Sequence, residues 1–310
     1  MEENLKPKKK KRKFFDSIAG VILSAILIFF AGSILGVGLF GLLGKAGDAL
    51  SPGFSSSDVW VTLYLYLPFI GIWLATLLFL AISPSNRPIF KALWTNTKGN
   101  SVKMLLVGLA IGLGMNLFCA AVAMLNGDIA LYFDSFKPVS FLFIFVFVFI
   151  QSSAEELICR AYIFQKLVKG YGKPILASVV NSVFFMFLHI LNNGVTVLSL
   201  INIMLYGLLF SAIVIYMDSL WCAMAVHAAW NFCQNILLGL PNSGSVLPYS
   251  VFKLDAASAQ NSFAYSVGFG LEGTITACAV LLAAAALIVW YGKKKGIHYT
   301  KIWENGAAEA

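Results

Sequence analysis

The sequence predicts an all-α membrane protein, a polytopic bundle of about eight transmembrane helices with both termini in the cytoplasm. Its 310 residues are 59% hydrophobic and only 12% charged, a composition far from that of soluble domains. Apolar segments long enough to cross a bilayer core of about 30 Å recur along the chain. The lysines and arginines of the connecting segments alternate in side, as the positive-inside rule requires of a multi-pass protein.

The expected spans follow one another with short connections, and the first follows a basic head. Its apolar stretch is longer than the roughly 7–15 residues of a signal-peptide core, so we expect it to remain as a helix. Glycines four residues apart, such as Gly32 and Gly36, allow helices to approach closely. The spans are residues 14–43, 59–82, 104–125, 140–167, 174–191, 197–216, 220–240 and 274–291.

These spans divide the chain into a head, two groups of helices, a long loop, a last helix and a tail. The loop is rich in Ser, Asn and Ala, so we expect a partly ordered flap without chemistry of its own, and the polar tail is expected to be mobile. The parts are a basic cytoplasmic head (1–13), three transmembrane helices (14–139), a core of helices four to seven (140–240), an extracytoplasmic loop (241–273), a last transmembrane helix (274–292) and a cytoplasmic tail (293–310).

Charge is concentrated at the two ends of the chain. The formal net charge is +8, and the basic residues between Lys6 and Lys13 look like a nucleic-acid-binding patch. Because they directly precede an apolar run, we expect them to set the topology and to contact anionic lipids, and we expect no nucleic-acid partner. The basic head and the lack of organelle signals favour a multi-pass protein of a bacterial plasma membrane.

One short stretch places charges inside a membrane-length apolar segment. Glu155, Glu156 and Arg160 follow the apolar run 141–150. Each such charge costs roughly 2.5–3.5 kcal/mol on insertion scales, so we expect it to face a protein interior or a wet cavity. On a helix Glu156 and Arg160 are four residues apart and can pair, whereas Glu155 is rotated by about 100° from Glu156. A structural brace needs only one pair, so the spare acid indicates a functional site.

Histidine is scarce, which makes its placement informative. His189 follows an apolar run with Phe185 one turn before it, and His227 has Asn231 four residues later on the same helix face. His298 lies in the polar tail and is expected to be solvated. A lone histidine in a membrane usually bonds between helices. Two histidines, an amide and a spare glutamate on three helices instead favour a site.

Three motifs carry a resemblance to a known family. They are Glu-Glu-x-x-x-Arg at 155–160, Phe-x-x-x-His at 185–189 and His-x-x-x-Asn at 227–231. With them, the sequence resembles the CAAX protease and bacteriocin-processing (CPBP, or Abi) family of intramembrane glutamic endopeptidases, over roughly residues 140–235. Cys159 and Ala161 depart from the aromatic residue and the glycine that are common there, and these departures concern substrate fit.

The resemblance implies an intramembrane protease that hydrolyses peptide bonds of membrane-associated peptides or protein tails, with residues 140–240 as its catalytic core and no cofactor or metal. Glu155 is then the base that activates water, together with His189. His227 and Asn231 donate to the developing oxyanion, as peptide hydrolysis requires. The supporting residues, which hold the helix face or pack beneath the site, are Glu156, Arg160 and Phe185.

Other chemistries remain open from the residues alone. Glu155, His189 and His227 match the ligand set of a catalytic zinc site, although no HExxH pair is present. The five cysteines show no CxxC spacing and are expected to be buried free thiols, and Ser152 and Ser153 have no evident base. A proton-coupled transporter and a non-catalytic immunity or scaffold protein are the remaining alternatives.

Overall fold

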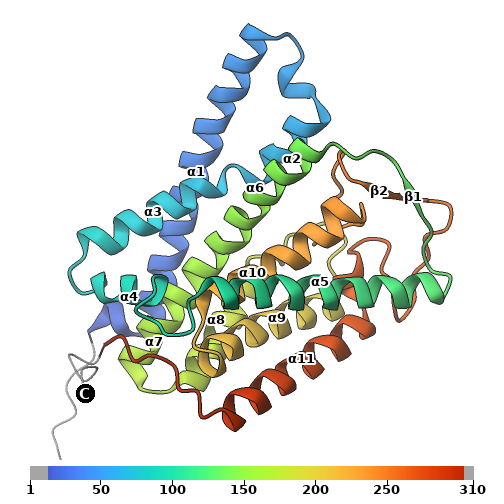
Figure 1. The fold of residues 1–310 in the computed structure, drawn as a ribbon. Coiled ribbons are helices and arrows are strands. Elements are labelled where there is room, and N and C mark those ends of the chain that lie inside the picture. Colours follow the sequence, from blue (N-terminus) through green and yellow to red (C-terminus); the bar gives the residue numbers. More distant parts are fainter. Residues whose placement is uncertain (1–12, 304–310) are drawn as a thin grey trace, which may run out of the picture.

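The computed structural model describes residues 13–303, and these are almost entirely helical (Figure 1). The basic head, with its expected lipid contact, lies outside the described residues except for Lys13. The α-helices are α1 (Ile18–Leu50), α2 (Asp58–Tyr66), α3 (Phe69–Ile82), α4 (Phe90–Leu93), α5 (Val102–Leu125), α6 (Pro138–Glu156), α7 (Phe164–Tyr171), α8 (Pro174–Phe187), α9 (Val197–Tyr216), α10 (Leu220–Phe232) and α11 (Ile275–Lys294).

The multi-pass helical fold is confirmed, but the count of eight spans is not. Within residues 13–303, 6 helical segments are long and apolar enough to cross a membrane: Ile18–Leu50, Asp58–Ile82, Val102–Leu125, Pro138–Tyr171, Val197–Tyr216 and Ile275–Lys294. The expected spans 174–191 and 220–240 correspond to the shorter α8 and α10, of 14 and 13 residues. At 1.5 Å per residue α8 covers only about 20 Å, whereas α10 is continued by the π-helical segment Cys233–Leu237. The side of the membrane that holds the termini remains a prediction.

Side chains at the helix starts explain where several helices begin. Ser17, Ser101, Ser219 and Thr274 each accept a hydrogen bond from a backbone N–H in the first turn of the helix that follows. Such caps satisfy donors that the helix itself leaves unpaired. Thr196 starts α9 with a reciprocal capping box.

Two helix pairs meet at glycines, as their spacing predicts. A Cβ atom on Gly36 of α1 would overlap the backbone of Pro68 at the start of α3, and one on Gly71 would overlap the backbone of α1. Gly108 and Gly112 of α5 lie in the same way against the backbone of α10. Only glycine permits these close backbone contacts, which fix α1 on α3 and α5 on α10.

Two π-helical segments interrupt the helices that carry the charged motifs. Leu157–Ile163 joins α6 to α7, and Cys233–Leu237 continues α10. Steeply tilted α6 crosses α10 near the middle of the molecule, while α5, α9, α10 and α11 run roughly side by side across it (Figure 1). The end of α6 therefore meets the middle of α10 within the bundle.

The long loop is more ordered than expected. Its strand β2 (Phe252–Leu254) pairs antiparallel with β1 (Leu131–Phe133) of the α5–α6 connection. The turn Asn242–Ser245 closes on itself through two backbone hydrogen bonds, each of 2.9 Å. The expectation of a partly ordered flap understates this segment, because the β1–β2 strand pair joins it to the α5–α6 connection.

The described part of the tail, up to Trp303, is also packed against the bundle, contrary to the expectation of a mobile segment. The backbone N–H and the hydroxyl of Thr300 donate to the two carboxylate oxygens of Asp218, at 2.6 and 2.8 Å. The indole of Trp303 donates to the Gln165 carbonyl oxygen at 2.9 Å. Burial raises the pKa of Asp218, although the hydrogen bonds from Thr300 oppose that shift. His298 is exposed, as predicted.

Candidate active site

A cavity of about 240 Å³ lies where α6, α8, α9 and α10 meet the long loop. The four residues that the motifs single out as catalytic all contribute to its wall, although they come from segments far apart in the sequence. Apolar side chains from α1, α2, α3 and α9 line much of the remainder, among them Phe29, Leu65, Phe69 and Ile203. The structure thus brings together Glu155, His189, His227 and Asn231 around one space.

Glu155 presents one carboxylate oxygen to this space. Its Oε1 accepts a hydrogen bond of 2.9 Å from the Gln151 side chain, one turn earlier on α6. Its Oε2 has no hydrogen-bond partner and lies 3.7 Å from His227 Nε2. The side chain is only 8% exposed. An unpaired buried oxygen is costly, and here it belongs to a residue that lines the cavity.

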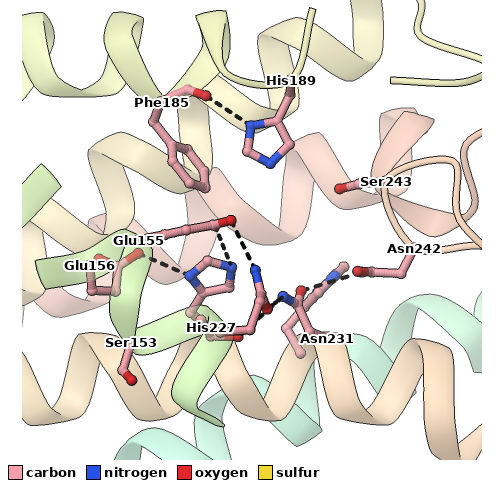
Figure 2. A network of polar contacts seen from close by, with 12 residues as sticks. Ser153, Glu155, Glu156, Phe185, His189, His227, Asn231, Asn242 and Ser243 are labelled. Atoms are coloured by element: carbon pink, nitrogen blue, oxygen red, sulfur yellow. Dashed lines mark hydrogen bonds and ion pairs between the residues drawn. The ribbon is translucent and has the colours of Figure 1, made fainter. Parts of the chain in front are cut away.

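His227 lies between the two adjacent glutamates (Figure 2). Its Nδ1 is 3.0 Å from Oε1 of Glu156, and the same oxygen accepts a hydrogen bond of 2.9 Å from Arg160. Glu156 and Arg160 are fully buried, and they pair as their spacing predicts. Glu156 therefore orients the imidazole as well as the arginine, so that Nε2 of His227 is the nitrogen closer to Glu155.

His189 lies on the opposite side of Glu155 from His227 (Figure 2). The helix α8 ends at Phe187, so His189 stands in the following turn and not in a span. Its Nδ1 is 2.8 Å from the Phe185 carbonyl oxygen. Because a carbonyl only accepts hydrogen bonds, Nδ1 carries the hydrogen, and in the neutral ring Nε2 is an acceptor. No contact between His189 and Glu155 is present within hydrogen-bonding distance.

Phe185 packs beneath the site, as predicted. Its ring lies 4.9 Å from the guanidinium carbon of Arg160, and it contacts both imidazoles edge-on. Phe210 of α9 lies 5.1 Å from the same guanidinium and stacks on His227. The aromatic rings hold the cation and the imidazoles in place and contribute cation–π attraction.

Asn231 is tied into a network of amides. Its Nδ2 donates to Oε1 of Gln151 and to Oγ of Ser152, both at 3.2 Å. Its Oδ1 accepts from Nδ2 of Asn242 at 3.3 Å. Both ends of the Asn231 side chain are therefore engaged, one with α6 and one with the long loop.

Several polar residues at the cavity escaped sequence analysis. Glu272 is 5% exposed, and burial raises the pKa of its carboxyl, while hydrogen bonds from Ser243 oppose that shift. The sequence assigned no chemistry to the loop, and the structure shows that the loop supplies a buried carboxylate and an amide to the wall. Gln151 could have been found from its position in the polar stretch before Glu155, but the loop residues follow no periodic pattern. The missed residues are Gln151, Asn242, Ser243 and Glu272.

Comparison with known proteins gives one match. Residues 137–233 match the family model described as type II CAAX prenyl endopeptidase Rce1-like. That match confirms the family resemblance. The Rce1-like segment begins at the residue before α6 and ends one residue beyond α10, so it contains all three motifs but not the loop. Searches of curated proteins and of solved structures found no match.

Within residues 13–303 the side chains form neither a metal-binding cluster nor an evident thiol or serine nucleophile with a base. No set of three or more His, Cys, Asp and Glu side chains there is arranged to hold a metal ion. Within the Rce1-like segment Cys159 is fully buried, and Ser153 donates to the Ile150 carbonyl oxygen. All five cysteines are free thiols, and four of them are buried as predicted, whereas Cys278 is half-buried. Independence from metal stays a prediction.

Proposed function

We propose that this protein is an intramembrane endopeptidase in which Glu155 activates a water molecule. The observation that carries this proposal is that Glu155, whose buried Oε2 has no hydrogen-bond partner, lines one cavity together with His189, His227 and Asn231. The Rce1-like match supports a membrane protease of the CAAX type. Catalysis by glutamate and histidine, without metal, is our inference from the side chains.

Glu155 is suited to the role of general base. A base must lie within about 2.6–3.2 Å of the proton that it removes, or reach it through a water. The oxygen Oε2 is free of hydrogen-bond donors, while Oε1 is held by Gln151. A water that enters beside Glu155 can therefore donate to Oε2 without displacing another hydrogen bond to that oxygen.

The two imidazoles differ in what they can do because their Nδ1 partners differ. His189 donates Nδ1–H to a carbonyl oxygen, so its neutral form offers a lone pair at Nε2. We assign His189 to sharing and orienting the water with Glu155. His227 has a carboxylate on each side. In its protonated form it donates to Glu156 from Nδ1 and keeps a second N–H at Nε2, which suits a developing oxyanion.

Asn231 completes the proposed oxyanion hole. Its Nδ2 hydrogens now bond to Gln151 and Ser152 at 3.2 Å, which is long for hydrogen bonds. A carbonyl oxygen that enters the cavity can replace one of these acceptors without leaving the amide unpaired. His227 and Asn231 lie four residues apart on α10, so both donate toward the same side.

The wall of the cavity indicates the substrate class. Many of its side chains are apolar or aromatic, among them Phe29, Leu65, Phe69, Leu188, Ile203 and Phe210. A membrane-associated peptide or protein tail with an apolar residue near the scissile bond would match this wall. The family's description names prenylated CAAX tails, which are therefore candidate substrates. We place the protein in a plasma membrane, consistent with a bacterial origin.

Glu155→Gln is the test of this function. With the purified protein in detergent and a library of membrane-associated peptides, the unmodified protein should cleave and the variant should lose about 100- to 10,000-fold in rate. Asp255→Asn is the matched control, since Asp255 is an exposed acid remote from the cavity. Equal cleavage by Glu155→Gln and the control would contradict the proposal. Activity that survives exhaustive chelation, with no metal by elemental analysis, would exclude the zinc alternative.

The transporter and scaffold alternatives can each be tested with the same Glu155→Gln variant. Uptake driven by a proton gradient in proteoliposomes, lost in Glu155→Gln, would favour a transporter. A cellular phenotype that the Glu155→Gln protein restores in full would favour a scaffold or immunity protein.

A further inference from the structure

The turn Asn242–Ser245 of the long loop stands directly over the cavity. Ser243 and Gly244 have positive φ angles of 47° and 82°, the pair of values that a tight two-residue hairpin turn requires. Asn242, Ser243 and Ser245 all line the cavity. A non-glycine residue at positive φ persists only where its surroundings hold it, and the surroundings here are the carboxylate of Glu272.

Glu272 accepts four hydrogen bonds at the base of this turn. Its Oε2 accepts from the backbone N–H of Ser243 at 2.7 Å and from the Ser243 hydroxyl at 2.8 Å. Its Oε1 accepts from the Trp230 indole and from the Asn242 amide, both at 3.1 Å. Only a carboxylate offers two oxygens that both accept and neither donates.

From Glu272 a continuous chain of amides leads to Glu155. The Asn242 amide nitrogen donates both to Glu272 and to Oδ1 of Asn231. The Asn231 nitrogen donates to Gln151, and the Gln151 nitrogen donates to Oε1 of Glu155. Asn242 directs its nitrogen at both Glu272 and Asn231. Asn231 and Gln151 each accept with the oxygen from the preceding amide and donate with the nitrogen toward Glu155.

We propose that Glu272 is a positioning residue, which sets the direction of this amide chain and thereby the side chains that act on the substrate. The inference rests on the proposed function. An amide can rotate by half a turn and exchange its oxygen and nitrogen at nearly the same positions, so only its neighbours decide its direction. Glu272 accepts hydrogen bonds only, and it therefore holds the Asn242 nitrogen. Asn242 in turn holds the Asn231 oxygen.

The hydrogen bond from Asn242 to the Asn231 oxygen also keeps the Asn231 nitrogen available to donate to an oxyanion. If the Asn242 donor is lost, the Asn231 oxygen loses its partner, and only the hydrogen bonds to Gln151 and Ser152 then hold the Asn231 side chain. Glu272 lies outside the Rce1-like segment, in the loop before α11. The loop is therefore part of the catalytic unit.

Glu272→Gln is the first test. A glutamine must direct its NH₂ at either the Ser243 donors or the Asn242 and Trp230 donors, so one contact pair becomes unfavourable. We expect kcat to fall about 10- to 100-fold, the range seen when outer-shell hydrogen-bond partners are removed, while KM changes little. A loss of folded protein with unchanged kcat per folded molecule would mean a purely structural role and would overturn the proposal.

Asn242→Ala is the second variant and keeps the inference testable if Glu272→Gln does not fold. It leaves the Ser243 and Trp230 bonds to Glu272 in place and breaks only the amide chain. We expect a similar fall in kcat, and the double variant should be no slower than the slower single one, because both act through one chain. Independent, multiplying losses would contradict the chain.

The controls separate this inference from the proposed function. Asp255→Asn changes an exposed acid of the same loop and should retain full kcat. If the unmodified protein cleaves no peptide, the proposed function fails. If it cleaves, and both Glu272→Gln and Asn242→Ala retain its kcat, the inference fails and the function stands.

Discussion

The two ends of the bundle bury polar groups in different ways. At the end that holds the termini, Lys166 pairs with Asp16, and Asp218 receives two hydrogen bonds from Thr300. At the other end, beneath the long loop, Glu155 keeps an oxygen without a partner in a cavity of about 240 Å³. Buried charge is common to both ends. What distinguishes the candidate site is a buried carboxylate that lines a cavity together with two histidines and an amide.

The difference separates residues that hold the fold from those that act on a substrate. Glu156 and Arg160 belong to the first kind although they adjoin the site, because each is enclosed and the pair is closed by His227. Glu155, one residue earlier, belongs to the second. Stability and activity should therefore respond in opposite ways to changes at these neighbouring positions.

The largest effect is expected from breaking the enclosed pair. Arg160→Met should destabilise the protein by about 3–5 kcal/mol, because it leaves the Glu156 carboxylate buried without its cation. Thermal unfolding in detergent measures this loss. Glu155→Gln, the matched change on the same helix, should alter the unfolding temperature little while it abolishes cleavage. Similar losses of stability in the two variants would contradict the distinction between residues that hold the fold and residues that act on the substrate.

A smaller effect on rate is expected at the oxyanion hole. Asn231→Ala should lower kcat about 100- to 1000-fold, as removal of one such donor does in other hydrolases. Asn181→Ala is the control, since Asn181 is also a buried amide, but it bonds to Ala177 and Ser211 away from the cavity. It should cost stability and leave kcat per folded molecule unchanged. Steady-state kinetics at equal folded concentration compares the two.

The smallest effect is expected at the terminal end. Burial raises the pKa of Asp218, so the folded protein holds this proton more tightly than the unfolded chain does. Its contribution to stability is therefore greatest below the ordinary carboxyl pKa and is lost as pH rises through the raised value. Asp218→Asn should flatten that part of the plot of unfolding temperature against pH. An unchanged slope would show that Asp218 does not carry the pH dependence.

The burial of Glu155, Glu156 and Arg160 could be predicted from the sequence, because a charged side chain in an apolar helix must face the protein interior or a wet cavity. The cost of burial made Glu155, Glu156 and Arg160 conspicuous, and helical spacing correctly paired the last two. The loop carboxylate Glu272 gave no such signal. It sits in a polar segment where a carboxylate costs nothing until the chain folds over it, so only coordinates reveal that it is buried.

Helical spacing was less informative where the helix is not regular. The sequence predicts α-helix through residues 140–167, but a π-helical segment begins at Leu157. His189 was expected within a span and lies in a turn, since α8 ends two residues before it. These departures bring the three motifs to one cavity, which upright regular helices of different lengths would not do.

The π-helical segment after Glu156 also bears on which length changes the chain can survive. Its hydrogen bonds close over one residue more than those of an α-helix. Deletion of a single residue within Leu157–Ile163 would let this helix become regular with no break in its backbone bonding. A deletion between Glu156 and Arg160 would bring these two residues from four to three positions apart and change the geometry of their ion pair. We therefore expect a chain shortened by one residue there to keep its membrane helices but to lose the arrangement of side chains around Glu156 and His227.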